Sequence, residues 1–340
     1  MKRHFRHIHQ KTPLTTKHQK GLLISSDYRW CLRGKEIEKN DMEEKQIIRW
    51  IKEHCATKQK QVRVGIGDDA AVVEYDKENY LLFTTDIVVD GVHFIAETTS
   101  PHQVGRKAIS VNISDIAAMG GIPLYALISI GMQQKPKATV YRGIYKGILE
   151  MAKIFNVGII GGNLSRSDVL FVDIFLIGKV RKKNIVLRST AKPDDLLFVT
   201  GTLGGAQKEK QFSFIPRIKE AKIIIKKTKP SAMIDISDGL ASDAKKLAEA
   251  SRCGFEIETW RIPVSKDADA KDRISSALYD GEDYELLFTV PPEIAKNVPE
   301  KINGTQITRI GSLTKKKTFI LKNKDGSKSK TFKEKFNHFS

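Results

Sequence analysis

The segment Ser231-Ala-Met-Ile-Asp-Ile-Ser-Asp-Gly-Leu-Ala-Ser-Asp243 is a short apolar run that ends in two carboxylates and a hydroxyl. Because side chains alternate along a strand, Asp235 and Ser237 would lie on one side, with Asp238 turning away at the strand's end. Two carboxylates this close repel each other unless a cation lies between them, and Mg²⁺ takes oxygen ligands of this kind. From Leu240 onward apolar residues recur at helical spacing, which predicts a strand, an acidic turn and a helix. The alternative is that Ser237 or Asp238 only caps that helix.

Polar turns follow apolar segments elsewhere in the chain. They are Gly65-Ile-Gly-Asp-Asp-Ala-Ala71, Leu81-Leu-Phe-Thr-Thr-Asp86, Asn112-Ile-Ser-Asp-Ile-Ala-Ala-Met-Gly-Gly121 and Ile159-Ile-Gly-Gly-Asn-Leu-Ser165. One acidic turn is ordinary, but isolated buried carboxylates are costly without a counter-charge. The repetition therefore predicts one shared cleft that is filled with metal ions.

The chain has 340 residues, which suffices for two domains of ordinary size. Hydrophobic residues make up 40% of it, as in globular proteins. The longest apolar runs fall far short of the roughly 20 residues that a membrane span needs, so no transmembrane helix is expected. Cys31, Cys55 and Cys253 are far apart and lack metal-ligand spacing, so neither a disulfide framework nor a zinc site is indicated. A reducing cytoplasm fits this pattern.

The formal net charge of +18 is concentrated at the ends of the chain. Residues 1–40 hold ten Lys/Arg against three Asp/Glu, and residues 313–340 hold nine against two. Charged tails are commonly just solvated, so no nucleic-acid partner is expected. A basic nucleic-acid-binding protein is the distant alternative, and its affinity would fall steeply with salt.

Residues 1–41 are predicted to be a basic, disordered extension, with an organelle-targeting peptide as the alternative. Beyond them, strand-like runs alternate with helical patterns, which predicts an α/β (α+β) fold. Residues 42–182 are expected to form one domain and residues 183–340 a second, α/β domain. The expected helices are 42–55, 101–120, 138–155, 215–227 and one from 240, and the main expected strands are 62–64, 124–131, 171–180, 194–200 and one ending before Pro291.

Several catalytic signatures are absent from the sequence. It has no Walker phosphate loop, no His-Glu-x-x-His, no nucleophile elbow and no dinucleotide fingerprint after a strand. Acidic turns without a nucleophile beside a base are better suited to holding metal and phosphate. Phosphoryl transfer needs in-line positioning and cations that neutralise the phosphoryl oxygens. The residues therefore predict a phosphotransferase that uses ATP and Mg²⁺ and lacks a Walker loop.

The sequence resembles the thiamine-monophosphate kinase family, of the aminoimidazole ribonucleotide synthetase-like superfamily. The resemblance runs from about Met42 to the C-terminus and is carried, in order, by Gly67-Asp-Asp-Ala-Ala71, Thr84-Thr-Asp86 with Gly91-Val-His-Phe94, Val111-Asn-Ile-Ser-Asp-Ile-Ala-Ala-Met-Gly120, Asp235-Ile-Ser-Asp-Gly-Leu240 and Gly281-Glu-Asp-Tyr-Glu-Leu286. It implies a two-domain fold whose N-terminal domain binds ATP and Mg²⁺ and pairs into a homodimer. It also implies ATP-dependent phosphorylation of thiamine monophosphate to thiamine diphosphate by direct in-line transfer.

The same resemblance implies roles for individual residues. The expected Mg²⁺ ligands are Asp69, Thr84, Thr85, Asp86, Asp115, Asn163, Asp235 and Asp238. The expected ATP-binding residues are Tyr145, Gly162, Asn163, Arg188 and Ser237. The residues expected to hold thiamine monophosphate are His93, Glu282 and Phe336. Asp86 and Asp235 are expected to be essential for catalysis.

Four of the residues assigned to nucleotide or substrate binding could have a simpler structural role. His93 fits equally a hydrogen-bonded core histidine, and Tyr145 fits a residue that only covers the core. Arg188 could be a solvated charge, although arginine suits phosphate oxygens bidentately. Phe336 could serve only to anchor the tail.

The sequence departs from the family pattern at two places. Asn163 stands where the family usually has aspartate, and an amide oxygen should bind Mg²⁺ more weakly than a carboxylate. The run Gly204-Gly-Ala-Gln207 is the second departure. The nearest alternative is another activity of the superfamily, as in aminoimidazole ribonucleotide synthetase or a hydrogenase maturation factor. The maturation factor would need a C-terminal cysteine, and this chain ends in Asn-His-Phe-Ser.

Overall fold

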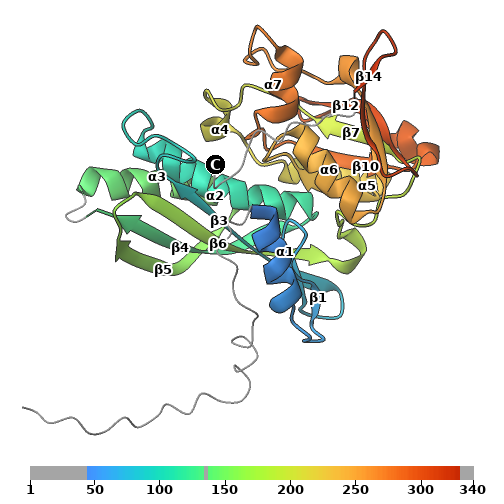
Figure 1. The fold of residues 1–340 in the computed structure, drawn as a ribbon. Helices are drawn as coiled ribbons and strands as arrows, with labels where there is room; N and C mark the ends of the chain where they lie inside the picture. The colour runs from blue at the N-terminus through green and yellow to red at the C-terminus, as the bar shows by residue number, and fades with distance from the viewer. Residues whose placement is uncertain (1–43, 134–136, 330–340) are drawn as a thin grey trace, which may run out of the picture. The chain divides into compact units, whose positions relative to one another are not determined.

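The computed structural model describes residues 44–133 and 137–329, which contain two β-sheets and their covering helices (Figure 1). The predicted disordered extension and Phe336 lie outside the described residues. Among the helices that are described, none has both the length and the apolar character needed to cross a membrane.

The first sheet has six strands in the order β1-β2-β3-β6-β4-β5. All its neighbouring strands run antiparallel except β4 and β5, which are parallel. Its elements are α1 (Glu44–His54), β1 (Val62–Val64), β2 (Ala71–Glu74), β3 (Asn79–Val89), α2 (Pro101–Ala118), β4 (Ile122–Met132), α3 (Ala138–Phe155), β5 (Gly158–Arg166) and β6 (Phe171–Arg181).

Helices α2 and α3 lie together over one face of this sheet (Figure 1). Ser100 starts α2 with a capping box, in which its side chain accepts from the Gln103 N–H and the Gln103 side chain accepts from the Ser100 N–H. The two helices approach closely because glycine faces backbone at their contact. A Cβ on Gly105 would lie 1.9 Å from the Ile144 carbonyl oxygen, and one on Gly147 would lie 2.0 Å from that of His102. This close packing fixes α2, which carries two residues of the site described below.

The second sheet has the order β14-β13-β9-β12-β7-β10-β8, with β11 paired to β12. Its strands are β7 (Leu196–Thr200), β8 (Ala232–Asp235), β9 (Gly254–Glu258), β10 (Leu286–Val290), β11 (Lys301–Ile302), β12 (Thr305–Thr314), β13 (Phe319–Lys322) and β14 (Lys328–Ser329). Its helices are α4 (Lys210–Ser213), α5 (Ile218–Thr228), α6 (Leu240–Ala250) and α7 (Arg273–Tyr279), with 3₁₀ turns at Lys182–Asn184, Thr259–Arg261 and Pro292–Asn297.

Strands β7, β8 and β10 of the second sheet are buried on both faces, and their alternate residues enter different cores. Leu197 and Ile234 pack into the core that α6 and α7 cover, whereas Phe198 and Met233 pack into the core that α5 covers. A strand buried on both faces reads as a continuous apolar run, which is why the sequence Ala-Met-Ile precedes Asp235.

The predicted helices and strands agree with the structure to within a few residues at their ends. Helix α1 is present as expected, and its Ile48 and Trp50 side chains are 47% and 49% exposed. The capping role considered for Ser237 or Asp238 is absent at the start of α6. Gly239 occupies the N-cap position without a side-chain cap, and the Asp243 carboxylate instead accepts the Asp238 N–H at 2.9 Å.

Candidate active site

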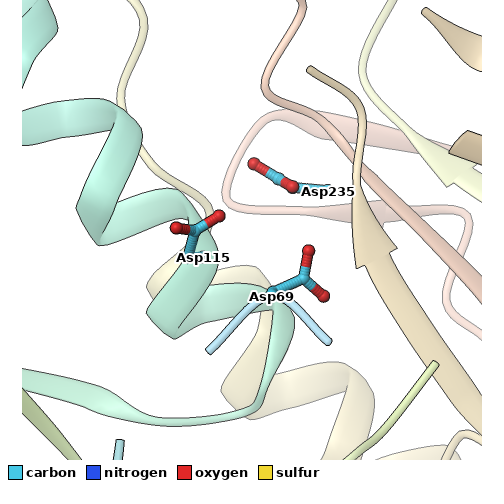
Figure 2. A group of neighbouring side chains, drawn as sticks. All are labelled: Asp69, Asp115 and Asp235. Atoms are coloured by element: carbon cyan, nitrogen blue, oxygen red, sulfur yellow. The ribbon is translucent and has the colours of Figure 1, made fainter. Parts of the chain in front are cut away.

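Three carboxylates from distant parts of the sequence converge on one point (Figure 2). Asp69 lies on the turn between β1 and β2, Asp115 lies on α2, and Asp235 is the last residue of β8. One oxygen from each carboxylate lies within 4.8 Å of the others. The predicted convergence of the acidic turns is therefore present in the folded chain for these three residues.

Neighbouring hydroxyl groups orient two of the three carboxylates. The Ser114 hydroxyl donates to Asp235 Oδ2 at 2.6 Å, and the Thr84 hydroxyl donates to Asp115 Oδ2 at 2.5 Å. Ser114 and Asp115 are consecutive on α2, so this helix supplies one carboxylate of the cluster and orients another. Because Asp235 belongs to the second sheet, the site requires both sheets to be packed as they are.

Asp69 has a different environment, in which one oxygen is paired and the other is not. Its Oδ1 accepts a hydrogen bond from the Arg188 guanidinium, and Arg188 Nε lies 3.7 Å from Asp68 Oδ1. Asp69 Oδ2 is buried and has no hydrogen-bond partner in the described part of the chain. A buried carboxylate oxygen without a donor is costly, which is the environment expected of an oxygen that binds a cation.

Burial dominates the electrostatics of this cluster. It raises the pKa values of Asp86, Asp115 and Asp235, and neighbouring carboxylates raise them further. Burial alone would lower the pKa of Arg188, but Asp69 and Asp68 outweigh it and raise that pKa. Arg188 offsets only part of the negative charge. Hard divalent cations take several carboxylate oxygens, so the donor set fits Mg²⁺.

A pocket extends from the cluster, and seven of the fifteen predicted site residues line it. The predicted residues that line it are Asp86, His93, Asp115, Asp235, Ser237, Asp238 and Glu282. Lining residues that the sequence reasoning missed include Val111, Gln207, Asp280 and Tyr284. Asp280 and Tyr284 flank Glu282 in the last motif, so the motif itself carried a signal for them.

The turn of Asp235 and the turn of Glu282 are hydrogen-bonded side by side. Glu282 N–H donates to the Ser237 carbonyl at 2.7 Å, and Tyr284 N–H donates to the Ile236 carbonyl at 2.8 Å. Glu282 and Tyr284 both adopt the left-handed backbone region, with φ of 61° and 49°. Such conformations are unfavourable for residues with a Cβ and persist where surrounding contacts enforce them, often at functional sites.

A network of charged side chains supports the turn that carries Glu282. Glu285 is 1% exposed and accepts two hydrogen bonds from Arg217, both at 2.7 Å, and one from Lys210 at 2.9 Å. Asp283 is also buried and accepts the Gly204 N–H at 3.0 Å. Burial raises the pKa of Asp283 to about 7. Of the acidic residues in this motif, Glu282 therefore lines the pocket, whereas Asp283 and Glu285 belong to the buried network that supports it.

The imidazole of His93 is oriented by the backbone of β3. The Val89 N–H donates to His93 Nδ1 at 3.1 Å, so Nδ1 acts as an acceptor and the hydrogen of a neutral ring resides on Nε2. Asp238, which also lines the pocket, pairs with Lys246 at 2.6 Å. Lys246 also pairs with the buried Asp243 at 2.8 Å. His93 thus lines the pocket with its Nδ1 engaged by the backbone, and Asp238 is held by a cation.

Some predicted ligands are not brought to the cluster. Thr85 is exposed and its hydroxyl donates to Asp173 Oδ1 at 2.9 Å, on the face of the sheet opposite Thr84. Asn163 is exposed on β5, paired in register with Ser129, and its side chain accepts the Leu164 N–H at 3.0 Å. Their roles as Mg²⁺ ligands remain predictions.

The predicted nucleotide-binding residues lie in varied surroundings. Tyr145 is partly buried on α3 and packs against the core, and Arg188 pairs with Asp69 beside the acidic cluster. Gly162 faces the β4 backbone so closely that a Cβ there would lie 1.9 Å from the Ile128 carbonyl oxygen. A glycine is therefore required at position 162 by packing, whatever its role in binding nucleotide.

The fold and the site place the chain among the AIR synthase related proteins. Residues 67–180 match the N-terminal domain of that class, and residues 188–323 match its C-terminal domain. The predicted fold class is thereby confirmed. Solved structures of the hydrogenase maturation protein HypE share the fold at lower identity; one in complex with ATP has a TM-score of 0.65 at 15% identity, covering 79% of this chain and 89% of that one.

Within this class, the relatives of higher identity are of one kind. The thiamine-monophosphate kinase of Bacillus subtilis is 35% identical over 305 residues, covering 82% of this chain and 94% of that protein. The enzyme of the same name from Rhodopirellula baltica is 36% identical over 267 residues, covering 74% and 84%. The solved structure of AaThiL complexed with AMPPCP and TMP has a TM-score of 0.75 at 32% identity and covers 87% of this chain and 97% of that one. The chain belongs to the thiamine-monophosphate kinase family.

Proposed function

We propose that this protein transfers the γ-phosphoryl group of ATP to thiamine monophosphate, giving thiamine diphosphate and ADP. Family membership supports the reaction class, and a relative has been solved with AMPPCP and TMP. The observation that carries the proposal is the convergence of Asp69, Asp115 and Asp235 at one end of a pocket that His93 and Glu282 also line. The pocket therefore joins an oxygen-rich metal site to a wall that carries an imidazole and a carboxylate.

The residues that would hold Mg²⁺ are Asp69, Asp115 and Asp235, with Asp86 and Asp238 beside them. Bound Mg²⁺ supplies neutralisation of the negative charge on the transferred phosphoryl group. Thr84 and Ser114 fix the rotations of Asp115 and Asp235 through their hydroxyl hydrogen bonds. Preset carboxylates need no rearrangement when the ligand arrives, which favours in-line transfer.

The described pocket does not need to supply a strong base for this reaction. The acceptor is a phosphate monoester, whose second pKa is about 6, so it is largely a dianion at neutral pH. One P–O bond forms between an acceptor oxygen and the γ-phosphorus, and the bond from that phosphorus to the bridging oxygen of ADP breaks. The residues of the chain therefore act by positioning and by charge, consistent with the absence of a nucleophile among the sequence motifs.

Arg188 fits a role in holding the nucleotide phosphates. Its guanidinium already lies at the metal cluster through Asp69, and its Nε is buried without a hydrogen-bond partner among the described residues. Arginine pairs bidentately with phosphate oxygens, which would satisfy the unpaired nitrogen. This geometry favours phosphate binding over a solvated surface charge.

We also propose that the first sheet pairs with that of a second copy of the chain. Helices α2 and α3 cover one face of this sheet, while the other exposes apolar residues in register across several strands. Tyr125 and Leu127 on β4 are 48% and 37% exposed, and they pair with Ile177 and Phe175 on β6. Extended apolar surfaces of this kind mark association sites. The cytoplasmic location stays a prediction, which the free thiols Cys55 and Cys253 support.

Incubation of the full chain with ATP, Mg²⁺ and thiamine monophosphate tests the reaction. Chromatography should detect equal amounts of thiamine diphosphate and ADP, and EDTA should abolish both. Thiamine in place of thiamine monophosphate serves as the control for acceptor choice and should give no product. ADP released without thiamine diphosphate would refute the proposed transfer.

A further inference from the structure

Lys107 is a fully buried lysine whose role the motifs do not explain. It lies on α2 and is 1% exposed. Its Nζ donates to Gln211 Oε1 at 2.6 Å and to the His93 carbonyl oxygen at 2.9 Å, and it lies 2.9 Å from Glu282 Oε2. A lysine ammonium has three donors, so these three acceptors satisfy it completely.

The three acceptors of Lys107 come from three separate segments around the pocket. His93 follows β3, Gln211 lies on α4, and Glu282 precedes β10. His93 and Glu282 line the pocket directly. Gln211 donates to the carbonyl oxygen of Gln207, another lining residue, so Lys107 is connected to three sides of the pocket.

Glu282 depends on Lys107 for charge and orientation. Its Oε2 accepts the Tyr284 hydroxyl at 2.8 Å and pairs with Lys107, so both partners act on the same oxygen. This arrangement fixes the rotation of the carboxylate. Glu282 also lies near the carboxylate cluster, where an uncompensated negative charge would add to the repulsion that already affects Asp86. Lys107 is the cation that neutralises Glu282 without entering the pocket.

We infer that Lys107 is a positioning residue for the acceptor substrate, because it holds His93 and Glu282 at a fixed separation on the pocket wall. The inference rests on the proposed function and deepens it. Lys107 does not line the pocket and does not touch the metal cluster, so its loss should weaken binding of thiamine monophosphate and leave binding of ATP nearly unchanged. A purely structural lysine would instead lower the folded fraction and with it the apparent kcat, with no selective change in the KM for thiamine monophosphate.

The test compares K107M with K107R and with R106M as a matched control. Arg106 is the preceding residue on α2 and donates to the Phe212 and Ser213 carbonyl oxygens, both at 3.3 Å, but contacts neither His93 nor Glu282. In K107M the KM for thiamine monophosphate should rise at least about tenfold, because Glu282 and the His93 carbonyl lose their donor. The KM for ATP should stay within about twofold, and R106M should change neither KM by more than about threefold.

A double-mutant cycle with E282Q shows whether Lys107 acts through Glu282. If it does, K107M/E282Q should raise the KM for thiamine monophosphate no more than about threefold beyond E282Q alone. K107R keeps the charge, but its planar guanidinium cannot serve three converging acceptors in the same way, so it should give an intermediate increase.

Several results would overturn the inference. They are a KM for thiamine monophosphate within twofold of wild type in folded K107M, or parallel increases in both KM values. If K107M does not fold by circular dichroism, K107R decides by the same criteria, and failure of both to fold assigns Lys107 a structural role instead. If the wild-type enzyme is active and the variants keep its KM values, this inference is refuted and the proposed function stands. A wild type that makes no thiamine diphosphate refutes the proposed function and, with it, the acceptor assigned here.

Discussion

Asp235→Asn should increase the stability of the metal-free protein and abolish its activity. One Asp235 oxygen lies within 4.8 Å of an oxygen of Asp69 and one of Asp115. At an effective dielectric constant of 20, two unit charges about 4.8 Å apart repel by about 3.5 kcal/mol. The raised pKa values mean that protonation already relieves part of this repulsion. We therefore expect a gain of about 1–3 kcal/mol at pH 8, where ionisation is greatest.

The Asp235→Asn substitution can retain the hydrogen bond from Ser114. The loss of charge repulsion therefore decides whether stability rises or falls. An asparagine carbonyl can still accept the Ser114 hydroxyl, which donates to Asp235 Oδ2 at 2.6 Å. Thermal unfolding in EDTA should therefore show a midpoint about 2–6 °C above wild type. Turnover should fall at least about a hundredfold, because a charged metal ligand is lost. Added Mg²⁺ should raise the midpoint of wild type more than that of the variant.

Asp195→Asn is the matched control. Asp195 is equally buried, at 3% exposure, but its Oδ2 accepts the Lys192 N–H at 2.8 Å and the Ser231 hydroxyl at 2.5 Å. No neighbouring carboxylate converges on it in the described structure, so the variant should gain no stability and keep turnover within about threefold. A lower unfolding midpoint for Asp235→Asn in EDTA, or near-normal turnover, would refute the assignment of this cluster as a repulsive metal site.

Three further predictions concern the remaining charges and surfaces. Burial raises the pKa of Asp243 to about 6 and that of Asp283 to about 7, so metal-free stability should be lost as the pH rises from the ordinary carboxyl pKa of about 4 through these values. Scanning fluorimetry in EDTA should give a midpoint that falls between about pH 4 and 7, and a rising midpoint would contradict the prediction. If the chain forms the proposed dimer, Leu127→Glu should convert it to a monomer in sedimentation velocity, whereas Leu149→Glu, at an exposed position of α3, should not. An intact Leu127→Glu dimer would exclude this face. Glu285→Gln removes the main carboxylate partner of the partly buried Arg217 and Lys210 and should cost about 1–3 kcal/mol in urea denaturation, so an unchanged midpoint would disprove its supporting role.

The elements were predictable wherever one periodicity persisted for several turns or residues. The expected helix 138–155 matches α3, and the expected strand 171–180 matches β6 within one residue. The acidic turns were recognisable because strand burial forces polar residues to the strand ends, as at Asp235. Local sequence therefore sufficed to predict which segments carry the site.

The position of Thr85 follows from the alternation of side chains along a strand. Thr84 and Thr85 are adjacent in a strand, so alternation already places them on opposite faces. Only Thr84 shares a face with Asp86, and Thr85 instead bonds to Asp173 across the open side of the sheet. Strand periodicity alone would have separated the two threonines.

Other parts of the site could not be read from local sequence at all. The position of Asn163 depends on the register between β5 and β4, which shifts between Ala126 and Leu127. Lys107 resembles any other lysine in the sequence, and its partners His93, Gln211 and Glu282 lie on segments that only the folded chain brings together. Long-range register and burial are tertiary properties, so no window of sequence around these residues contains the information.

Repulsion within the acidic cluster destabilises the packing that brings its carboxylates together. Asp115 belongs to the helix that covers the first sheet and Asp235 to the edge of the second, and the Ser114 hydroxyl joins the two beside the point where their carboxylates repel. The cost of that repulsion falls on the folded state, because the carboxylates separate when the chain unfolds. A cation that binds only the assembled site removes this cost, so metal binding and the packing of α2 against β8 must stabilise each other.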